Sequence, residues 1–171
     1  MSKIIFLIGM SGAGKTEWGQ QIAETYNLPF YDIDRYLEAE HEKNVTQLFS
    51  QHGEPGFRIL EGNALRTIVR IQAPPFILSC GGGTPILSQN LTLMKQHGIL
   101  IYLKATIPTL LHNLKDCLSA RPMLTNGIIN PTQKLTELYE KRKKIYEEAH
   151  YTFDVENFSV QDVAHIVAQA Q

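Results

Sequence analysis

The chain has 171 residues, of which 43% are hydrophobic and 19% charged, and its formal net charge is −1. This length and composition suit one globular domain with its own apolar core, and the small charge creates no field that would recruit nucleic acid or an anionic membrane. No apolar run reaches the length of a membrane span, and two cysteines, Cys80 and Cys117, provide no disulfide framework. We therefore expect a cytoplasmic protein, with Cys80 as a small apolar filler.

Short apolar runs alternate with helical patterns along the chain. Five runs are expected to be strands, at residues 3–8, 29–32, 76–79, 98–103 and 152–155. Helical patterns lie near 15–26, 34–43, 46–51, 54–70, 88–97, 108–118, 131–149 and 159–170, with Ser88 and Ser159 as candidate N-caps. Apolar strands that alternate with helices predict a doubly wound α/β fold, in which helices cover both faces of a parallel sheet.

The turn after the first strand carries a complete phosphate-binding motif. Residues 9–16 read Gly-Met-Ser-Gly-Ala-Gly-Lys-Thr, which matches G-x-x-x-x-G-K-[ST]. Glycines let backbone N–H groups wrap around a phosphate, and the following helix directs its positive end at the same anion. We expect a nucleotide phosphate site at Gly12, Ala13, Gly14, Lys15 and Thr16, where Lys15 reaches the β- and γ-phosphates and Thr16 ligates Mg²⁺. An ordinary glycine-rich turn is the alternative.

Two carboxylates, Asp32 and Asp34, follow the second strand in Tyr31-Asp32-Ile33-Asp34. Residues i and i+2 of a strand point the same way, so both carboxylates are expected beside the phosphate loop at the carboxyl edge of the sheet. The strand at 76–79 runs into Cys80 without the acidic residue that commonly accompanies the metal there. Asp32 is therefore the candidate metal ligand and Asp34 the candidate general base. Alternatively, Asp34 caps the next helix.

Two further segments have the composition of an anion site. Arg58 and Glu61 are i, i+3 neighbours, so Glu61 can hold the guanidinium in place to bind a carboxylate; an exposed surface pair is the alternative. Gly81, Gly82 and Gly83 directly follow a strand and can bring backbone N–H groups close to a ligand. The alternative for these glycines is a bare flexible turn.

The stretch 121–130, Arg-Pro-Met-Leu-Thr-Asn-Gly-Ile-Ile-Asn, is irregular, because its Pro, Gly and Asn residues disfavour a helix. A basic residue that opens such a segment suits a lid, so Arg121 is expected to neutralise charge on a transferring phosphoryl group. The later run 139–144 has mixed charges, and a solvated helix face is its default explanation. Spacing alone does not distinguish Arg142 from its lysine neighbours.

Taken in order, these segments resemble the shikimate kinases, small members of the P-loop kinases. The resemblance runs through nearly the whole chain and rests on residues 9–16, Asp32-x-Asp34, Gly53-Glu54-x-x-Phe57-Arg58-x-x-Glu61, Gly81-Gly82-Gly83, Arg121-Pro122-Met123-Leu124 and Arg142 before Tyr146. The first motif marks only the superfamily. The G-E-x-x-F-R-x-x-E segment and the later R-P-M-L are specific to the family.

The resemblance implies an enzyme that transfers the γ-phosphoryl group of ATP to the 3-hydroxyl of shikimate, with Mg²⁺, in aromatic amino acid biosynthesis. The implied catalytic residues are Lys15, Asp34 and Arg121, with Arg121 also on the nucleotide and with Thr16 and Asp32 at the metal. The implied substrate-binding residues are Asp34, Arg58, Glu61, Gly81, Gly82, Gly83 and Arg142. The implied fold is one domain over residues 1–171 with a five-stranded parallel sheet in the order 2-3-1-4-5, a substrate-binding region at about 34–61 and a lid at about 119–130. We expect a monomer.

Two positions depart from the family pattern. Leu114 stands seven residues before Arg121, where many relatives have an arginine that stacks on adenine, and Glu156-Asn157-Phe158 replaces another common arginine after the last strand. We therefore expect adenine to lie against Lys115 or the 156–158 loop.

Two other functions compete with this interpretation. Another small P-loop kinase, of the gluconate or nucleoside monophosphate type, is disfavoured by the carboxylate-binding set of Arg58, Glu61 and Arg142. A non-catalytic nucleotide-binding regulator is disfavoured because Lys15, Asp34 and Arg121 are all intact.

Overall fold

The computed structural model describes residues 2–115 and 130–171, built around a five-stranded sheet in the order β2-β3-β1-β4-β5. The strands are β1 Ile4–Ile8, β2 Phe30–Asp32, β3 Phe76–Ser79, β4 Gly98–Lys104 and β5 Tyr151–Asp154, and every neighbouring pair is parallel. Every residue of β1 and β3 is buried, as expected for strands covered on both faces. The predicted fold class and strand order are confirmed.

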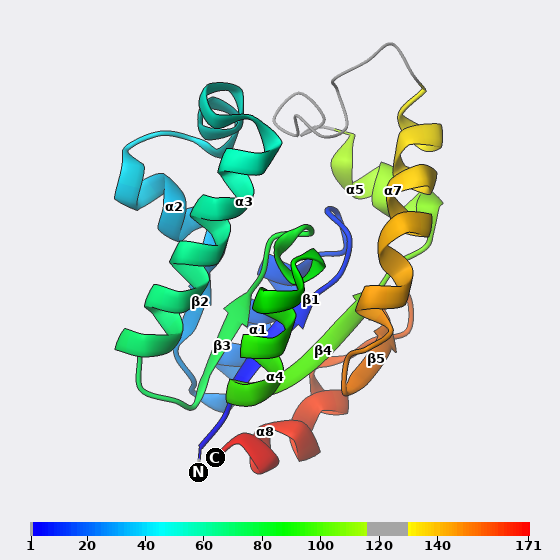
Figure 1. The fold of residues 1–171 in the computed structure, drawn as a ribbon. Coiled ribbons are helices and arrows are strands. Elements are labelled where there is room, and N and C mark those ends of the chain that lie inside the picture. Colours follow the sequence, from blue (N-terminus) through cyan, green and yellow to red (C-terminus); the bar gives the residue numbers. More distant parts are fainter. Residues whose placement is uncertain (1, 116–129) are drawn as a thin grey trace.

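Helices connect the strands and cover both faces of the sheet. They are α1 Lys15–Tyr26, α2 Ile33–His41, α3 Val45–Ile71, α4 Ser88–His97, α5 Ile107–Leu114, α7 Pro131–Tyr146 and α8 Ala164–Ala170, with short 3₁₀ helices η1 Thr84–Ile86 and η3 Val160–Val163. At the carboxyl edge of the sheet, α3 and α7 stand on opposite sides, whereas α8 and the two ends of the chain lie toward the other edge (Figure 1). Within the described parts of the chain, no helix has both the length and the apolar character to cross a bilayer.

Two helical regions differ from the sequence-based expectation, one in its continuity and one in its N-cap. The predicted helices at 46–51 and 54–70 form a single element, α3, that bends at Gly53, where φ is 64° and ψ is 178°. This backbone conformation is accessible to glycine and strained for other residues. Ser88 is not an N-cap, because α4 begins at Ser88 itself and Leu87 precedes it without a side-chain cap. Ser159 does precede η3, and its N–H donates to Asp162 at 2.8 Å.

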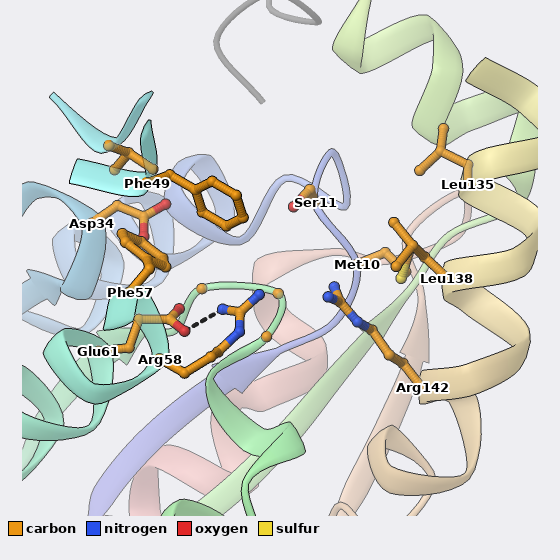
Figure 2. Close-up of a pocket in the computed structure, with 14 residues that line it drawn as sticks. Met10, Ser11, Asp34, Phe49, Phe57, Arg58, Glu61, Leu135, Leu138 and Arg142 are labelled. Carbon is orange, nitrogen blue, oxygen red and sulfur yellow. Dashed lines mark hydrogen bonds and ion pairs between the residues drawn. The ribbon is translucent and has the colours of Figure 1, made fainter. Parts of the chain in front are cut away.

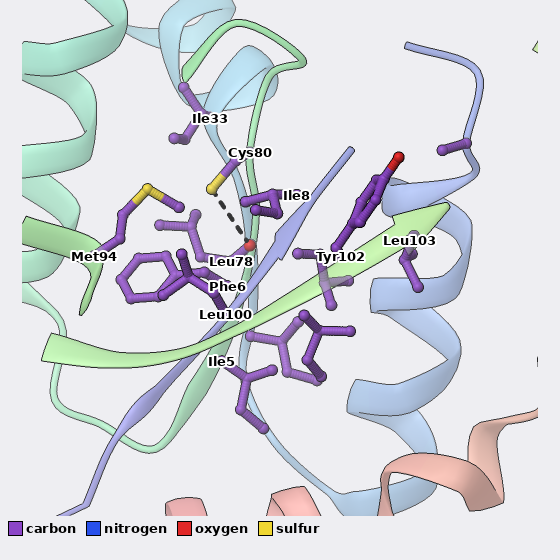
Figure 3. Packing of buried hydrophobic residues seen from close by; sticks show 14 of the residues in the cluster. Ile5, Phe6, Ile8, Ile33, Leu78, Cys80, Met94, Leu100, Tyr102 and Leu103 are labelled. Atoms are coloured by element: carbon purple, nitrogen blue, oxygen red, sulfur yellow. Dashed lines mark hydrogen bonds between the residues drawn. The ribbon is translucent and has the colours of Figure 1, made fainter. Parts of the chain in front are cut away.

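The core packs around the central strands, where Phe6, Leu78, Leu100 and Tyr102 lie close together (Figure 3). Cys80 is buried at the end of β3 within this cluster, and its burial raises the pKa of the thiol. A thiol that stays protonated is a poor nucleophile, which supports the predicted packing role. The sheet thus gives a rigid base to the loops at its carboxyl edge.

Candidate active site

The loop between β1 and α1 has the backbone that its glycines predict. Gly9, Gly12 and Gly14 have positive φ angles of 143°, 88° and 77°. Gly14 is the residue before α1 and provides no side-chain cap for the first-turn N–H groups, and Lys15, Thr16 and Glu17 of that turn line the cavity beside the loop. Lys15 is 8% exposed, and its ammonium donates to the carbonyl oxygens of Gly9 at 3.0 Å and Met10 at 2.8 Å. The adjoining cavity of about 510 Å³ is lined by Ser11, Lys15, Thr16, Asp32 and Asp34, among others, and suits a polyphosphate.

Three oxygen-bearing side chains meet beside this loop. The Thr16 hydroxyl donates to Asp32 Oδ2 at 2.7 Å and lies 3.5 Å from the Ser79 hydroxyl. Asp32 also caps α2, since its Oδ1 accepts the N–H of Arg35 at 3.2 Å. The alternative that Asp34 caps this helix is therefore wrong.

The sequence analysis missed Ser79, although its position carried a signal. It is the last residue of β3, paired in register with Asp32, where an acidic residue was sought and not found. A hydroxyl at this position places a third oxygen beside Thr16 and Asp32.

The Arg58 guanidinium forms an ion pair with Glu61 and a second, at 3.4 Å, with Glu54. Glu61 is only 1% exposed, so the alternative of an exposed surface pair is wrong. A buried carboxylate needs both its charge and its remaining lone pairs satisfied. Its second oxygen accepts the Thr84 hydroxyl at 3.0 Å.

The glycine turn at 81–83 packs tightly against this pair. A Cβ on Gly83 would lie 2.2 Å from Arg58 Cζ, and one on Gly81 would lie 2.3 Å from Glu61 Oε1. The Tyr146 hydroxyl donates to the Gly82 carbonyl at 2.5 Å. Burial raises the pKa of Tyr146 to about 12, although neighbouring Arg142 acts in the opposite direction, so the hydroxyl remains a donor. The alternative of a bare flexible turn is wrong.

Arg142 approaches the same space from the opposite side. Arg58 extends from α3 and Arg142 from α7, and their guanidinium groups point toward one pocket (Figure 2). Arg142 is 8% exposed, on the buried face that α7 forms with Leu135, Leu138 and Tyr146. It is therefore not part of a solvated face. The pocket also has apolar walls, made by Met10, Val45, Phe49, Phe57, Leu135 and Leu138.

This pocket and the phosphate cavity adjoin one another. Ser11, Asp34, Gly81 and Gly82 line both of them. Asp34 thus lies where a group bound between the two arginines would meet a phosphate bound at the loop. Arg121 and the expected lid lie outside the described residues.

Several residues near the expected adenine site make other contacts in the structure. Leu114 is buried against the phosphate loop, where a Cβ on Gly12 would lie 2.8 Å from its Cγ, and Asn113 donates to the Gly12 carbonyl at 2.8 Å. Phe158 is buried and packs edge-on against Trp18, with ring centroids 4.8 Å apart. Lys115 is exposed, and an adenine site beside it or beside the 156–158 loop stays a prediction.

Glu156 begins the 156–158 loop and fixes it to the start of α5. Its carboxylate accepts the Thr106 N–H at 3.1 Å and the Thr109 hydroxyl at 2.7 Å. These hydrogen bonds lower the pKa of Glu156 to about 2, so it is ionised at neutral pH. The sequence analysis noted this residue only as a departure from the family pattern, and here it holds Thr106, the N-cap residue of α5.

Comparison of the sequence with known proteins identifies the family to which this chain belongs. The family model for shikimate kinase matches residues 11–171. The chain belongs to the shikimate kinase family. It is 34% identical over 169 residues to a shikimate kinase of Parabacteroides distasonis, which covers 98% of this chain and 96% of that protein. A shikimate kinase of Caldanaerobacter subterraneus is 33% identical, with 98% and 95% covered.

Solved structures agree with this membership. A shikimate kinase from Acinetobacter baumannii, solved in complex with shikimate, has a TM-score of 0.86 and 33% identity, covering 99% of this chain and 92% of that one. A gluconokinase from Sinorhizobium meliloti has a TM-score of 0.58 and 18% identity over 99% of this chain and 89% of that one, so that likeness extends to the fold alone.

Proposed function

We propose that this member of the family transfers the γ-phosphoryl group of ATP to the 3-hydroxyl of shikimate. One observation carries the proposal: Asp34 lies at the junction of an arginine-lined pocket and the phosphate-loop cavity. An acceptor bound in the pocket would place a hydroxyl between this carboxylate and the terminal phosphate. That arrangement suits direct transfer between two bound substrates.

The pocket fits an acceptor that has a carboxylate and a compact ring. Arg58 and Arg142 approach from opposite sides, and a guanidinium binds a carboxylate through two parallel hydrogen bonds. Glu61 keeps Arg58 extended toward the pocket. Phe49 and Phe57 provide apolar contacts for the ring face. A guanidinium also binds phosphate, so the arginines alone do not choose the acceptor, and it is their combination with a compact apolar pocket that favours shikimate over a nucleoside monophosphate.

The remaining residues would act on the transferring group. Asp34 would accept the proton of the attacking hydroxyl, because carboxylates commonly take this role in kinases. Lys15 and the loop N–H groups would stabilise the negative charge that moves from the acceptor oxygen to the β-phosphate. Arg121 would add a second cation, as the family resemblance implies.

The oxygens of Thr16 and Asp32 fit a magnesium ion. Mg²⁺ prefers hard oxygen ligands and is usually held by one or two carboxylates together with substrate phosphates. A dedicated cluster of three acidic or histidine side chains is therefore unnecessary, and none is found among the described residues. When bound with the nucleotide, Mg²⁺ would neutralise charge on the β- and γ-phosphate oxygens.

The test is an ADP-release assay with ATP and Mg²⁺ across three acceptors: shikimate, gluconate and a nucleoside monophosphate. We expect turnover with shikimate and only background release with the other two. Turnover of gluconate or the nucleotide without turnover of shikimate would assign the chain to another metabolite kinase. Nucleotide binding without turnover of any acceptor would favour the regulator.

A further inference from the structure

A chain of buried hydrogen bonds runs from α4 to the acceptor pocket. Asn90 Nδ2 donates to the Thr84 carbonyl at 2.9 Å, and the Thr84 hydroxyl donates to Glu61 Oε1 at 3.0 Å. Glu61 Oε2 in turn pairs with Arg58. Asn90, Thr84 and Glu61 are all buried, so water does not compete freely for these bonds. The chain therefore connects a rigid part of the fold to the guanidinium that faces the pocket.

Thr84 is itself held in place on both sides. Its N–H donates to the Gly81 carbonyl at 3.0 Å, and its own carbonyl accepts from Asn90. The glycine turn, η1 and α4 thus fix the position of the hydroxyl. Because the terminal torsion of a glutamate side chain is broad, a single ion pair leaves the carboxylate free to rotate. A second hydrogen bond from a fixed donor removes that freedom.

The same hydroxyl and the proposed base, Asp34, both lie against Gly81. A Cβ placed on Gly81 would lie 2.3 Å from Glu61 Oε1, 3.1 Å from Thr84 Oγ1 and 3.4 Å from Asp34 Oδ1. These three oxygens therefore surround one point of the glycine turn, at the boundary between the two cavities. A rotation of Glu61 at this point moves the partner of Arg58 away from the pocket.

We propose that Thr84 is a positioning residue for acceptor binding: its hydroxyl fixes the Glu61 carboxylate and thereby aims Arg58 at the acceptor's carboxylate. The inference rests on the proposed function, since it requires a carboxylated acceptor. It predicts that Thr84 affects how strongly the pocket recognises the carboxylate, and that it leaves the binding of ATP unchanged.

The experiment compares Thr84→Val, which keeps the volume and loses the hydroxyl, with Thr84→Ser, which keeps the hydroxyl. Calorimetry measures the binding of shikimate, of its uncharged methyl ester and of ATP to each variant. The control is Tyr26→Phe, which removes a hydroxyl that donates to the Val160 carbonyl at 3.1 Å, outside both cavities. We expect Thr84→Val to lower the preference for the acid over the ester by about ten-fold, the size expected for an unpaired buried oxygen. Thr84→Ser and Tyr26→Phe should keep the wild-type preference.

Failure of this inference is distinguishable from failure of the proposed function. If the wild-type protein binds no shikimate, the proposed function is wrong and the inference falls with it. If the wild type prefers the acid and Thr84→Val keeps that preference, only the inference is overturned. An equal loss in Thr84→Ser, or a parallel loss for acid, ester and ATP, also overturns it by assigning Thr84 a merely structural role. Should Thr84→Val not fold, Thr84→Ala is judged by the same criteria, and failure of both to fold assigns the structural role.

Discussion

Replacing each pocket arginine by methionine should affect the stability of the protein differently, with a clear loss for Arg58 and little or no loss for Arg142, although both changes should weaken acceptor binding. Arg58→Met leaves the Glu61 carboxylate buried without its counter-ion, whereas Arg142→Met removes a buried cation. Within the described residues, no carboxylate lies within ion-pair distance of Arg142. Methionine retains much of the side-chain volume, so the comparison isolates the charge.

The expected magnitudes follow from burial. Removing one partner of a buried ion pair costs about 3–5 kcal/mol. The Arg58 side chain is 14% exposed and Thr84 still donates to Glu61, so the lower end of the range applies. A loss of about 3 kcal/mol lowers Tm by about 6–12 °C in a chain of this length. Arg142→Met should change stability by less than about 1 kcal/mol or raise it, because an apolar group replaces a desolvated charge.

Thermal unfolding without substrates measures the first effect, and steady-state kinetics measures the second. Both variants should raise the KM for shikimate by about thirty-fold or more, since each loses a contact to the acceptor carboxylate. Adding Glu61→Gln to Arg58→Met should recover part of the lost Tm, because the unpaired charge is removed as well. If Arg142→Met loses as much Tm as Arg58→Met, the reasoning from burial and pairing is refuted.

Three further substitutions test the remaining roles. Lys15→Ala should lower kcat by about a hundred-fold or more, because it removes a buried cation beside the transferring phosphoryl group. An unchanged rate constant for phosphoryl transfer in single-turnover measurements would contradict this. Asp34→Asn should lower kcat by about a hundred-fold while ATP binding, followed by calorimetry, stays near wild type; near-normal turnover would remove Asp34 as the base. Tyr146→Phe should raise the KM for shikimate several-fold and the KM for ATP by less, because Tyr146 lies on the α7 face that carries Arg142, although its partner Gly82 lines both cavities. Equal effects on both KM values would show that the hydroxyl serves only the fold.

The sequence predicted the sheet well because its central strands, β1, β3 and β4, are buried on both faces. Continuous apolar runs with turn residues at each end leave little freedom in where a strand begins, and all five observed strands start within a residue of the expected position. The phosphate loop and the carboxylate pair were predictable for a related reason. Both follow parallel strands, and the carboxyl ends of such strands must meet at one edge.

Hydroxyl partners were harder to predict, because they depend on tertiary contacts. The Tyr146 hydroxyl meets Gly82 across 64 residues and the Thr84 hydroxyl meets Glu61 across 23, and no local pattern marks either pair. The cap of α2 was missed for a different reason: Asp32 and Asp34 both suit an N-cap, and the backbone that selects Asp32 is set by the end of β2.

Arg142 was recoverable from the sequence by helical periodicity. Leu135, Leu138, Arg142 and Tyr146 are spaced by three, four and four residues, so they share one face of α7, and the structure buries that face. A cation on an apolar helix face is costly unless it serves a ligand or a partner. The neighbouring lysines fall on other faces, which is why the charge run alone did not single out Arg142.

The departures at Leu114 and Glu156 bear on the nucleotide base and leave the proposed chemistry intact. Leu114 packs against Gly12, and Glu156 holds Thr106, the N-cap residue of α5, so both residues stabilise the frame around the phosphate loop. An arginine stacked on a base would contribute about 0.5–2 kcal/mol that Leu114 does not supply. Under the proposed function, the phosphate and metal contacts would therefore carry a larger share of nucleotide affinity. The residues proposed for them lie on the β1–α1 loop and at the end of β2, whereas Arg58 and Arg142, proposed to bind the acceptor, lie on α3 and α7. Selectivity for the base could then vary without altering recognition of the acceptor.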